Sequence, residues 1–249
     1  MTWTLVGWVA IGLSALLLGL FWVLSKQSGF YPGRKIPSTE SLLRAQINSI
    51  ERGQHRQIIL GDQFWSFTYP GLGLHALNNL SSFLDSETAV EGGLTISAGN
   101  PELVVFARQI VHQSYRDGFS SNLPPARIQT VLPGPTPLSL TAGLLPVLNT
   151  SRHGSLALFG HYGPEAILWT EAARSRGSAI FAAAGTLSSQ AALFLSVHDL
   201  VLGENVFMLP GLLKMRQEDQ ASWLAEDILR ILLMLGLIIG AALKLAGVL

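Results

Sequence analysis

Short apolar runs alternate with helical patterns through the middle of this 249-residue chain. The runs show little polar alternation, which is typical of strands that are buried on both faces. They lie at 57–60, 94–97, 128–132, 155–159, 178–182 and 200–202, and the helical patterns lie at 74–84, 101–115, 138–148, 164–176, 189–197 and from 203 through Trp223. Most of these helical patterns have the length of right-handed crossovers between parallel strands. The alternation predicts a Rossmann-like α/β fold, an open, mainly parallel sheet covered by helices.

Two apolar segments stand at the ends of the chain, at 3–24 and at 228–249. As a helix the first would rise about 33 Å, close to the roughly 30 Å hydrocarbon core of a bilayer. The second contains Lys244, whose amine would extend to the interface from its place near the chain end. We therefore expect one transmembrane helix at each end, in 1–25 and 227–249. A helix lying in the interface is the alternative for the second, although Arg230 and Lys244 form no polar stripe.

Basic residues gather at the inner ends of both predicted spans. They are Lys26, Arg34 and Lys35 after the first span and Lys214, Arg216 and Arg230 around the second. The positive-inside rule then places the large middle region in the cytoplasm. The expected location is an inner (plasma) membrane, crossed twice, with the lipid bilayer as a partner. In this reading 26–53 is a linker with an amphipathic helix, and 54–226 is the Rossmann-like domain.

Composition excludes several functions. The formal net charge is +0, which leaves no long-range attraction for nucleic acid, and the chain has no cysteine, which excludes disulfides and thiolate metal sites. Only 13% of residues are charged and the mean hydropathy is +0.39. The six histidines show no metal-binding spacing. We therefore expect no nucleic-acid partner, no metal and no cofactor.

Candidate site residues lie in the loops that follow the predicted strands, because ligands of such sheets sit beyond the carboxyl ends of the strands. These loops are 97–101, 133–137, 160–165, 184–189 and 203–205. Their polar residues predict a pocket for a small ligand lined by Asn100, His161, Glu165, Thr186, Ser188 and Glu204. The alternative, common in βα turns, is that these residues only shape the turns and cap the helices.

Motifs for catalysis or nucleotide binding are weak. The segment 71–76 matches the G-x-G-x-x-A dinucleotide fingerprint, but Pro70 precedes it and no acidic residue ends the next predicted strand. There is no phosphate-binding loop of the G-x-x-x-x-G-K-[ST] type. His161 and Glu165 are the best acid–base pair in the sequence, but a pair without a third group does not define a reaction. No catalytic residue is therefore predicted.

Four segments carry a resemblance to a known family: 97–102, 160–166, 184–186 and 199–207. Between about Gly53 and Gly211 the chain resembles a bacterial membrane-anchored family described as domain of unknown function 6754. The resemblance implies membrane anchorage around an α/β domain and implies no activity. If a site exists, it points to Glu165, Thr186 and Glu204.

Two functions compete on this evidence. The first is a membrane-anchored, non-enzymatic α/β module that self-associates into a homo-oligomeric assembly or scaffold, with other membrane proteins as further partners. Gly236 and Gly240, four residues apart, predict close helix packing in that assembly. The alternative is a cytoplasmic ligand-binding or sensory domain that binds a small metabolite or nucleotide at the strand-end loops. A hydrolase or transferase built on His161 and Glu165 ranks third.

Overall fold

The computed structural model describes residues 12, 19, 37–61, 71–86, 93–116, 128–150, 153–214 and 226–238. The chain divides into two compact units. One comprises Met1–Arg34 with Met215–Leu249, and the other comprises Lys35–Lys214. The second unit holds all the strands of the described part of the chain and carries the candidate site.

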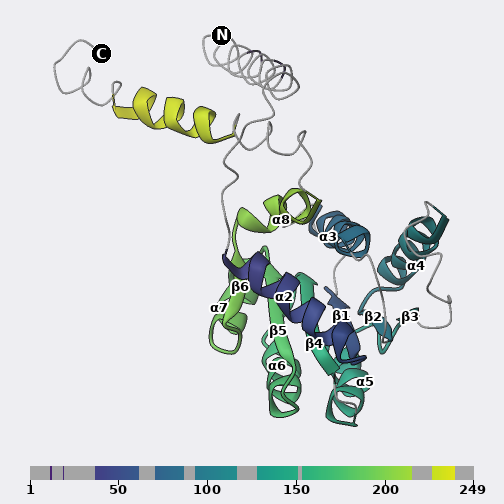
Figure 1. The fold of residues 1–249 in the computed structure, drawn as a ribbon. Coiled ribbons are helices and arrows are strands. Elements are labelled where there is room, and N and C mark those ends of the chain that lie inside the picture. The colour runs from purple at the N-terminus through teal and green to yellow at the C-terminus, as the bar shows by residue number, and fades with distance from the viewer. Residues whose placement is uncertain are drawn as a thin grey trace, which may run out of the picture. The chain divides into compact units, whose positions relative to one another are not determined.

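A six-stranded parallel sheet forms the centre of the second unit (Figure 1). Its strands are β1 (His55–Leu60), β2 (Leu94–Ala98), β3 (Ile128–Val131), β4 (His153–Gly160), β5 (Ala179–Ala184) and β6 (Asp199–Leu202). They lie in the order β3-β2-β1-β4-β5-β6, and every neighbouring pair is parallel. This is the doubly wound order, in which the chain builds outward from β1 and then from β4. The predicted parallel α/β sheet is confirmed.

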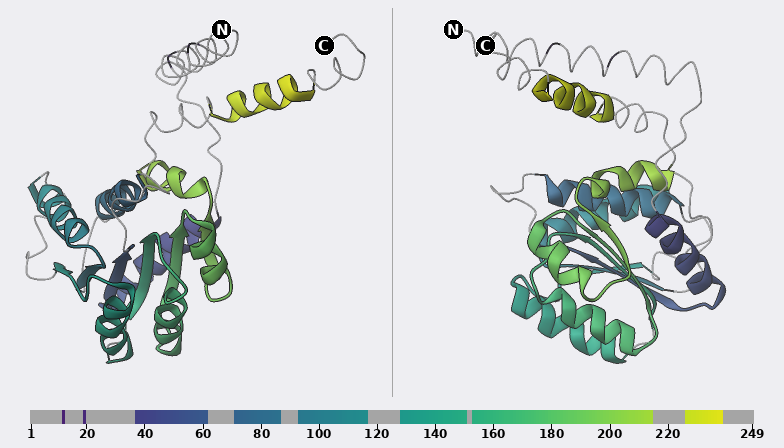
Figure 2. Two further views of the ribbon diagram at one scale, coloured as in Figure 1. Left: turned by 180° about the vertical axis from the view of Figure 1, so that it is seen from behind. Right: turned by 90° about the vertical axis from the view of Figure 1, so that its left-hand side faces the viewer.

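Helices cover both faces of the sheet, as Figure 2 shows. One face carries α2 (Pro37–Glu51), α3 (Leu72–Ser86), α4 (Pro101–Arg116) and α8 (Asn205–Lys214), and the other carries α5 (Pro137–Thr150), α6 (Ala166–Ser175) and α7 (Leu187–Phe194). Successive strand residues alternate between the two layers. Ile58 and Leu60 pack in the first core, and Ile59 packs in the second. The uninterrupted apolar runs of the sequence are explained by this burial on both faces.

Aromatic side chains anchor the second core. Trp169 of α6 is fully buried, and its indole Nε1 donates a hydrogen bond to Thr141 Oγ1 of α5 at 3.1 Å. Its ring meets the ring of Tyr162 edge to face, with centroids 5.7 Å apart. The Tyr162 hydroxyl donates to the carbonyl oxygen of Ile59 in β1 at 2.6 Å. Both aromatic residues thus satisfy their polar atoms while they fill the core.

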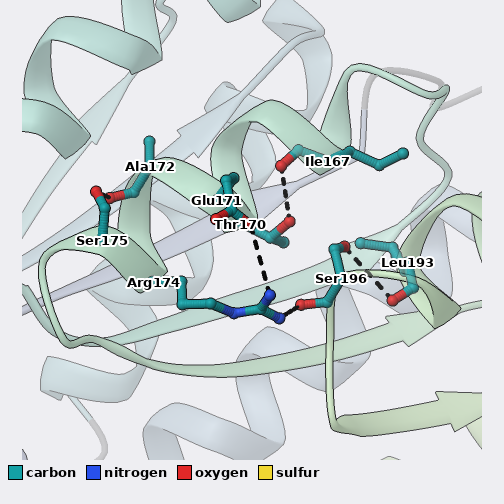
Figure 3. A network of polar contacts seen from close by, with 8 residues as sticks. All are labelled: Ile167, Thr170, Glu171, Ala172, Arg174, Ser175, Leu193 and Ser196. Atoms are coloured by element: carbon teal, nitrogen blue, oxygen red, sulfur yellow. Dashed lines mark hydrogen bonds and ion pairs between the residues drawn. The ribbon is translucent and has the colours of Figure 1, made fainter.

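Arg174 joins the end of α6 to the turn that follows α7 (Figure 3). Its guanidinium donates a hydrogen bond to the carbonyl oxygen of Ser196 and lies 3.4 Å from the Glu171 carboxylate. Arg174 and Glu171 are exposed, so their ion pair contributes little. The bond to the Ser196 carbonyl holds the turn after α7 against α6.

The expectation of membrane-spanning helices is overturned. Within the part of the chain that the structure describes, no helix is both long enough and apolar enough to cross a bilayer. In the second apolar segment the structure describes residues 226–238, which are helical. Of the first segment, 3–24, all but Gly12 and Gly19 lies outside the described residues.

This correction extends to the predictions built on the spans. The fold class is corrected to a parallel α/β sheet covered by helices, since no helix among the described residues could span a membrane as expected at each end. The two-pass location in a bacterial inner membrane, with the large domain placed in the cytoplasm, is overturned by the same finding. Gly236 lies in the described helix, where an added Cβ would meet nothing within 4 Å, and Gly240 lies outside the described residues. Their role in oligomerisation stays a prediction.

Two histidines face each other at the start of β1 and β4. The rings of His55 and His153 lie 5.4 Å apart, and His55 Nε2 is 2.8 Å from Thr95 Oγ1 of β2. Burial lowers the pKa of His55, and the charges of His153 and Arg56 lower it further. Burial also lowers the pKa of His153, against a weaker raising effect of its bond to the Val147 carbonyl. The folded pair therefore resists protonation more than two solvent-exposed histidines would.

We predict that the protein loses stability when the pH falls from about 7.5 to about 5.5. The unfolded histidines take up protons near pH 6.5, whereas the folded pair resists protonation, so stability is full above that pH and falls below it. The expected loss of unfolding free energy is about 1 kcal/mol. It is not larger, because His55 is partly exposed and solvent screening reduces its contribution. Urea unfolding at several pH values measures it.

The control separates this pair from the other histidines. The double variant His55→Gln with His153→Gln should flatten the pH dependence, and a residual slope is expected from His75, whose pKa burial also lowers. His112→Gln, which changes an exposed histidine, should keep the wild-type slope. Equal slopes for the wild type and the double variant would contradict the prediction.

Candidate functional site

The candidate site lies where the strand order reverses, between β1 and β4. In a doubly wound sheet, the loops from these two strands leave in opposite directions and open a crevice beyond the carboxyl ends. Gly61 follows β1, and the loop 161–165 follows β4. The loop 185–186 follows β5 and leads into α7. These three segments position the side chains of the site.

Backbone atoms meet closely at the carboxyl ends of β1 and β4. Gly61 N donates to the carbonyl oxygen of Phe159 at 2.9 Å, which extends the β1–β4 pairing beyond the strands. A Cβ on Gly61 would lie 2.5 Å from the backbone nitrogen of His161 and 2.6 Å from its carbonyl oxygen. Gly160 has a φ of +125°, a conformation that L side chains rarely adopt. Only glycine at these two positions allows the strand ends to approach so closely.

A buried cluster of hydroxyl groups holds His161 beside these strand ends. Thr186 Oγ1 lies 2.7 Å from His161 Nδ1 and 2.7 Å from Ser189 Oγ. Ser189 Oγ accepts from Tyr162 N at 2.8 Å and donates to the Tyr162 carbonyl oxygen at 2.6 Å. Thr186 and Ser189 are fully buried, whereas His161 is partly exposed. The cluster therefore fixes the loop after β4 against the start of α7.

Counting protons in this cluster assigns the histidine tautomer. Ser189 uses its only hydroxyl proton toward the Tyr162 carbonyl, so Thr186 must be the donor in its contact with Ser189. The Thr186 hydroxyl then has no proton left for His161, and the imidazole must donate from Nδ1. On this assignment Nε2 is the acceptor nitrogen of a neutral His161 ring.

Local rules explain the cluster. Thr186 has an extended backbone and is the N-cap of α7, where its side chain accepts from Ser189 N. Ser189 is three residues on, at the position whose backbone N–H a capping side chain reaches. The sequence pattern predicts Thr186 and Ser188 as site residues, but it does not predict Ser189 or Gly61. The T-x-x-S spacing at a predicted helix start was the available signal for Ser189.

The other predicted residues act mainly in their own turns. Glu165 Oε1 accepts from Gly163 N at 2.7 Å, and Asn100 Oδ1 accepts from the backbone N of Glu102 at the start of α4, at 2.8 Å. Ser188 is exposed and lies 3.4 Å from Thr186, oxygen to oxygen. Glu204 is partly exposed in the turn before α8.

Strand spacing separates the six predicted residues into groups. Asn100 follows β2 and Glu204 follows β6, and these strands lie on opposite sides of β4, two positions away from it in each direction. At about 4.8 Å between neighbouring strands, Asn100 and Glu204 belong to loops about 19 Å apart. The structure brings His161, Thr186 and Ser188 together and leaves Asn100 and Glu204 apart from them.

The fingerprint-like segment 71–76 lies in the expected part of the topology but departs from the motif. Gly71 has a φ of +90° and directly precedes α3, the helix between β1 and β2. However, the helix begins at Leu72, well after β1 ends at Leu60, whereas the dinucleotide motif follows its strand directly. His75 packs edge to face on Phe207 of α8, with centroids 4.4 Å apart. The segment therefore contributes to helix packing.

A cavity of about 450 Å³ lies elsewhere, at the β3 edge of the sheet between α4 and β3. It is lined by Arg108, Val111, His112, Ile128, Gln129, Thr130 and Val131. The cavity does not include the residues of the crevice. Among the described residues, no group of three or more histidine and acidic side chains is placed to hold a metal ion.

Comparisons of the chain with protein-family models, with curated proteins and with solved structures give no match. The interpretation of the site therefore rests on its own geometry.

We predict that Gly61→Ala destabilises the α/β unit by about 2–3 kcal/mol. The added Cβ would meet backbone atoms of His161, which cannot move aside as a side chain does. Gly177→Ala is the matched control, because Gly177 has a φ of +76° but open space around its Cβ position, so it costs only about 1 kcal/mol of backbone strain. Urea unfolding of both variants gives the comparison. A loss for Gly61→Ala no larger than that for Gly177→Ala would contradict the close approach.

Proposed function

We propose that the α/β unit binds a small metabolite or nucleotide in the crevice beyond β1, β4 and β5. The observation that carries this proposal is the fixed, partly exposed imidazole of His161 at the point of strand-order reversal. A partly exposed imidazole suits the polar groups of a small ligand. The exposed Ser188 hydroxyl and the first backbone N–H groups of α7 suit an anionic group, such as a phosphate or carboxylate.

Binding fits the site better than hydrolysis. Ser189 is the buried serine nearest to His161, but its proton is directed to the Tyr162 carbonyl and its oxygen accepts from Tyr162 N. Glu165, the carboxylate of the predicted acid–base pair, bonds Gly163 N. The nucleophile and the carboxylate that a hydrolase would use are thus both engaged in holding turns.

The proposal is tested by thermal unfolding of the full chain with AMP, ADP, NAD and inorganic phosphate, each added separately. A ligand at about 100 times its Kd adds about 2.7 kcal/mol to stability, which raises Tm by about 5–10 °C for a unit of this size. We expect at least one of these probes to give such a shift. His161→Ala should weaken its binding about tenfold, because the ring contact is lost.

Glu171→Gln is the matched control, because it changes an exposed side chain on the outer surface of α6. It should leave binding unchanged. The proposal fails if none of the four probes changes Tm, or if His161→Ala and Glu171→Gln bind a probe equally well.

A second candidate function is self-association, which the sequence also predicted. The observation that favours it is an uncharged apolar face on α7.

A further inference from the structure

Helix α7 covers the sheet at the surface of the α/β unit, and it contains no charged residue. The sequence has no Asp, Glu, Lys or Arg anywhere in 177–197, a segment that covers β5 and α7. A strand buried on both faces needs no charge, but a surface helix normally carries charged or polar residues on its outer side. The outer side of α7 therefore requires an explanation other than solvation.

The two sides of α7 differ in burial but not in apolar character. Ser189, Ala192 and Leu193 are buried against the sheet. On the opposite side, Leu187, Phe194 and Leu195 are 78%, 71% and 79% exposed, and the small residue Ala191 lies between them. Positions 187, 191, 194 and 195 follow helical spacing and share one side. We call Leu187, Ala191, Phe194 and Leu195 the α7 stripe.

This arrangement differs from ordinary exposed leucines, which are common on protein surfaces. Leu138 of α5 is 81% exposed, but it is a single residue at the start of its helix. The α7 stripe instead presents three large side chains on two helical turns. Leu168, 52% exposed in the first turns of the neighbouring α6, adds to the apolar surface on this side of the sheet. A contiguous apolar patch of this kind marks an interaction site.

We propose that a second copy of this chain docks on the α7 stripe, with the two α7 helices antiparallel about a twofold axis near Ala191. Leu187 of each copy then packs on Phe194 and Leu195 of the other. This pairing follows from the pattern of the stripe, which is bulky at both ends and small in the middle, so that the axes can approach at Ala191. Because the stripe has no charge, two identical faces do not repel each other.

General sizes of apolar patches and of stable interfaces indicate how strong the dimer should be. The largest apolar patch on a typical monomer covers about 300–600 Å², whereas a stable interface takes about 800 Å² from each partner. The stripe therefore forms the centre of the contact, and further residues around it must contribute the remaining area. We expect a reversible dimer with a Kd in the micromolar range. This proposal does not depend on ligand binding in the crevice.

Sedimentation velocity of the full chain over about 1–200 µM tests the dimer, a range chosen to bracket that Kd. The wild type should change from monomer to dimer, and Phe194→Asp with Leu195→Asp should stay monomeric throughout. Leu138→Asp is the control, because it places an aspartate at an equally exposed leucine outside the stripe. It should dimerise like the wild type. Tm and circular dichroism of the variants, measured in parallel, verify that each is folded.

A cysteine cross-link tests the geometry. Because the chain has no cysteine, Ala191→Cys introduces a single thiol at the proposed twofold axis. Mild oxidation should link most of this variant into covalent dimers, whereas Ala142→Cys, at an exposed alanine of α5, should link slowly. A wild type that stays monomeric at all concentrations overturns the proposal and leaves the stripe to another protein. Dimerisation that persists in the double aspartate variant, or equal cross-linking of the two cysteine variants, overturns the assigned surface.

Discussion

The pairing of β1 with β4 is the contact on which the rest of the α/β unit depends. These strands run side by side from His55 and His153 to Leu60 and Phe159, and all other strands are added outward from them. The pairing continues beyond the strands through the Gly61 N–H, at a point where no Cβ fits. A side chain at Gly61 would separate the strand ends and move His161. The same close backbone contact thus sets both the register of the sheet centre and the position of the candidate site.

Helix α7 links that site to the outer surface. Its first turn is fixed from the inside by Thr186 and Ser189, which bind the loop after β4. The turn that follows α7 is fixed by Arg174, which donates a hydrogen bond to the Ser196 carbonyl. Both ends of this short helix are therefore anchored. The helix cannot rotate about its axis, so its apolar outer side cannot turn toward the core. This explains why Phe194 and Leu195 remain exposed although they are as apolar as the buried Leu193.

Much of the fold could be predicted from the sequence, because burial on both faces removes polar residues from strands. The predicted strand at 94–97 corresponds to β2 at Leu94–Ala98, and the one at 155–159 lies inside β4. The predicted helix at 189–197 was placed about two residues late, because the Thr186 cap, rather than the apolar pattern, begins α7. The order of the strands could not be predicted, since hydrophobic periodicity carries no information on neighbours. For that reason Asn100 and Glu204 were grouped with His161, although their strands lie apart.

The contrast between α6 and α7 separates an ordinary surface helix from an interaction surface. Both helices cover the same face of the sheet, and both bury small residues and one large side chain against it. On its outer side α6 carries Glu171 and Arg174, which bond each other and are well solvated. The outer side of α7 has no such pair, and nothing in its packing requires leucine or phenylalanine there. The exposed leucine and phenylalanine side chains of α7 contribute neither to the core nor to solubility, and contact with a partner explains them.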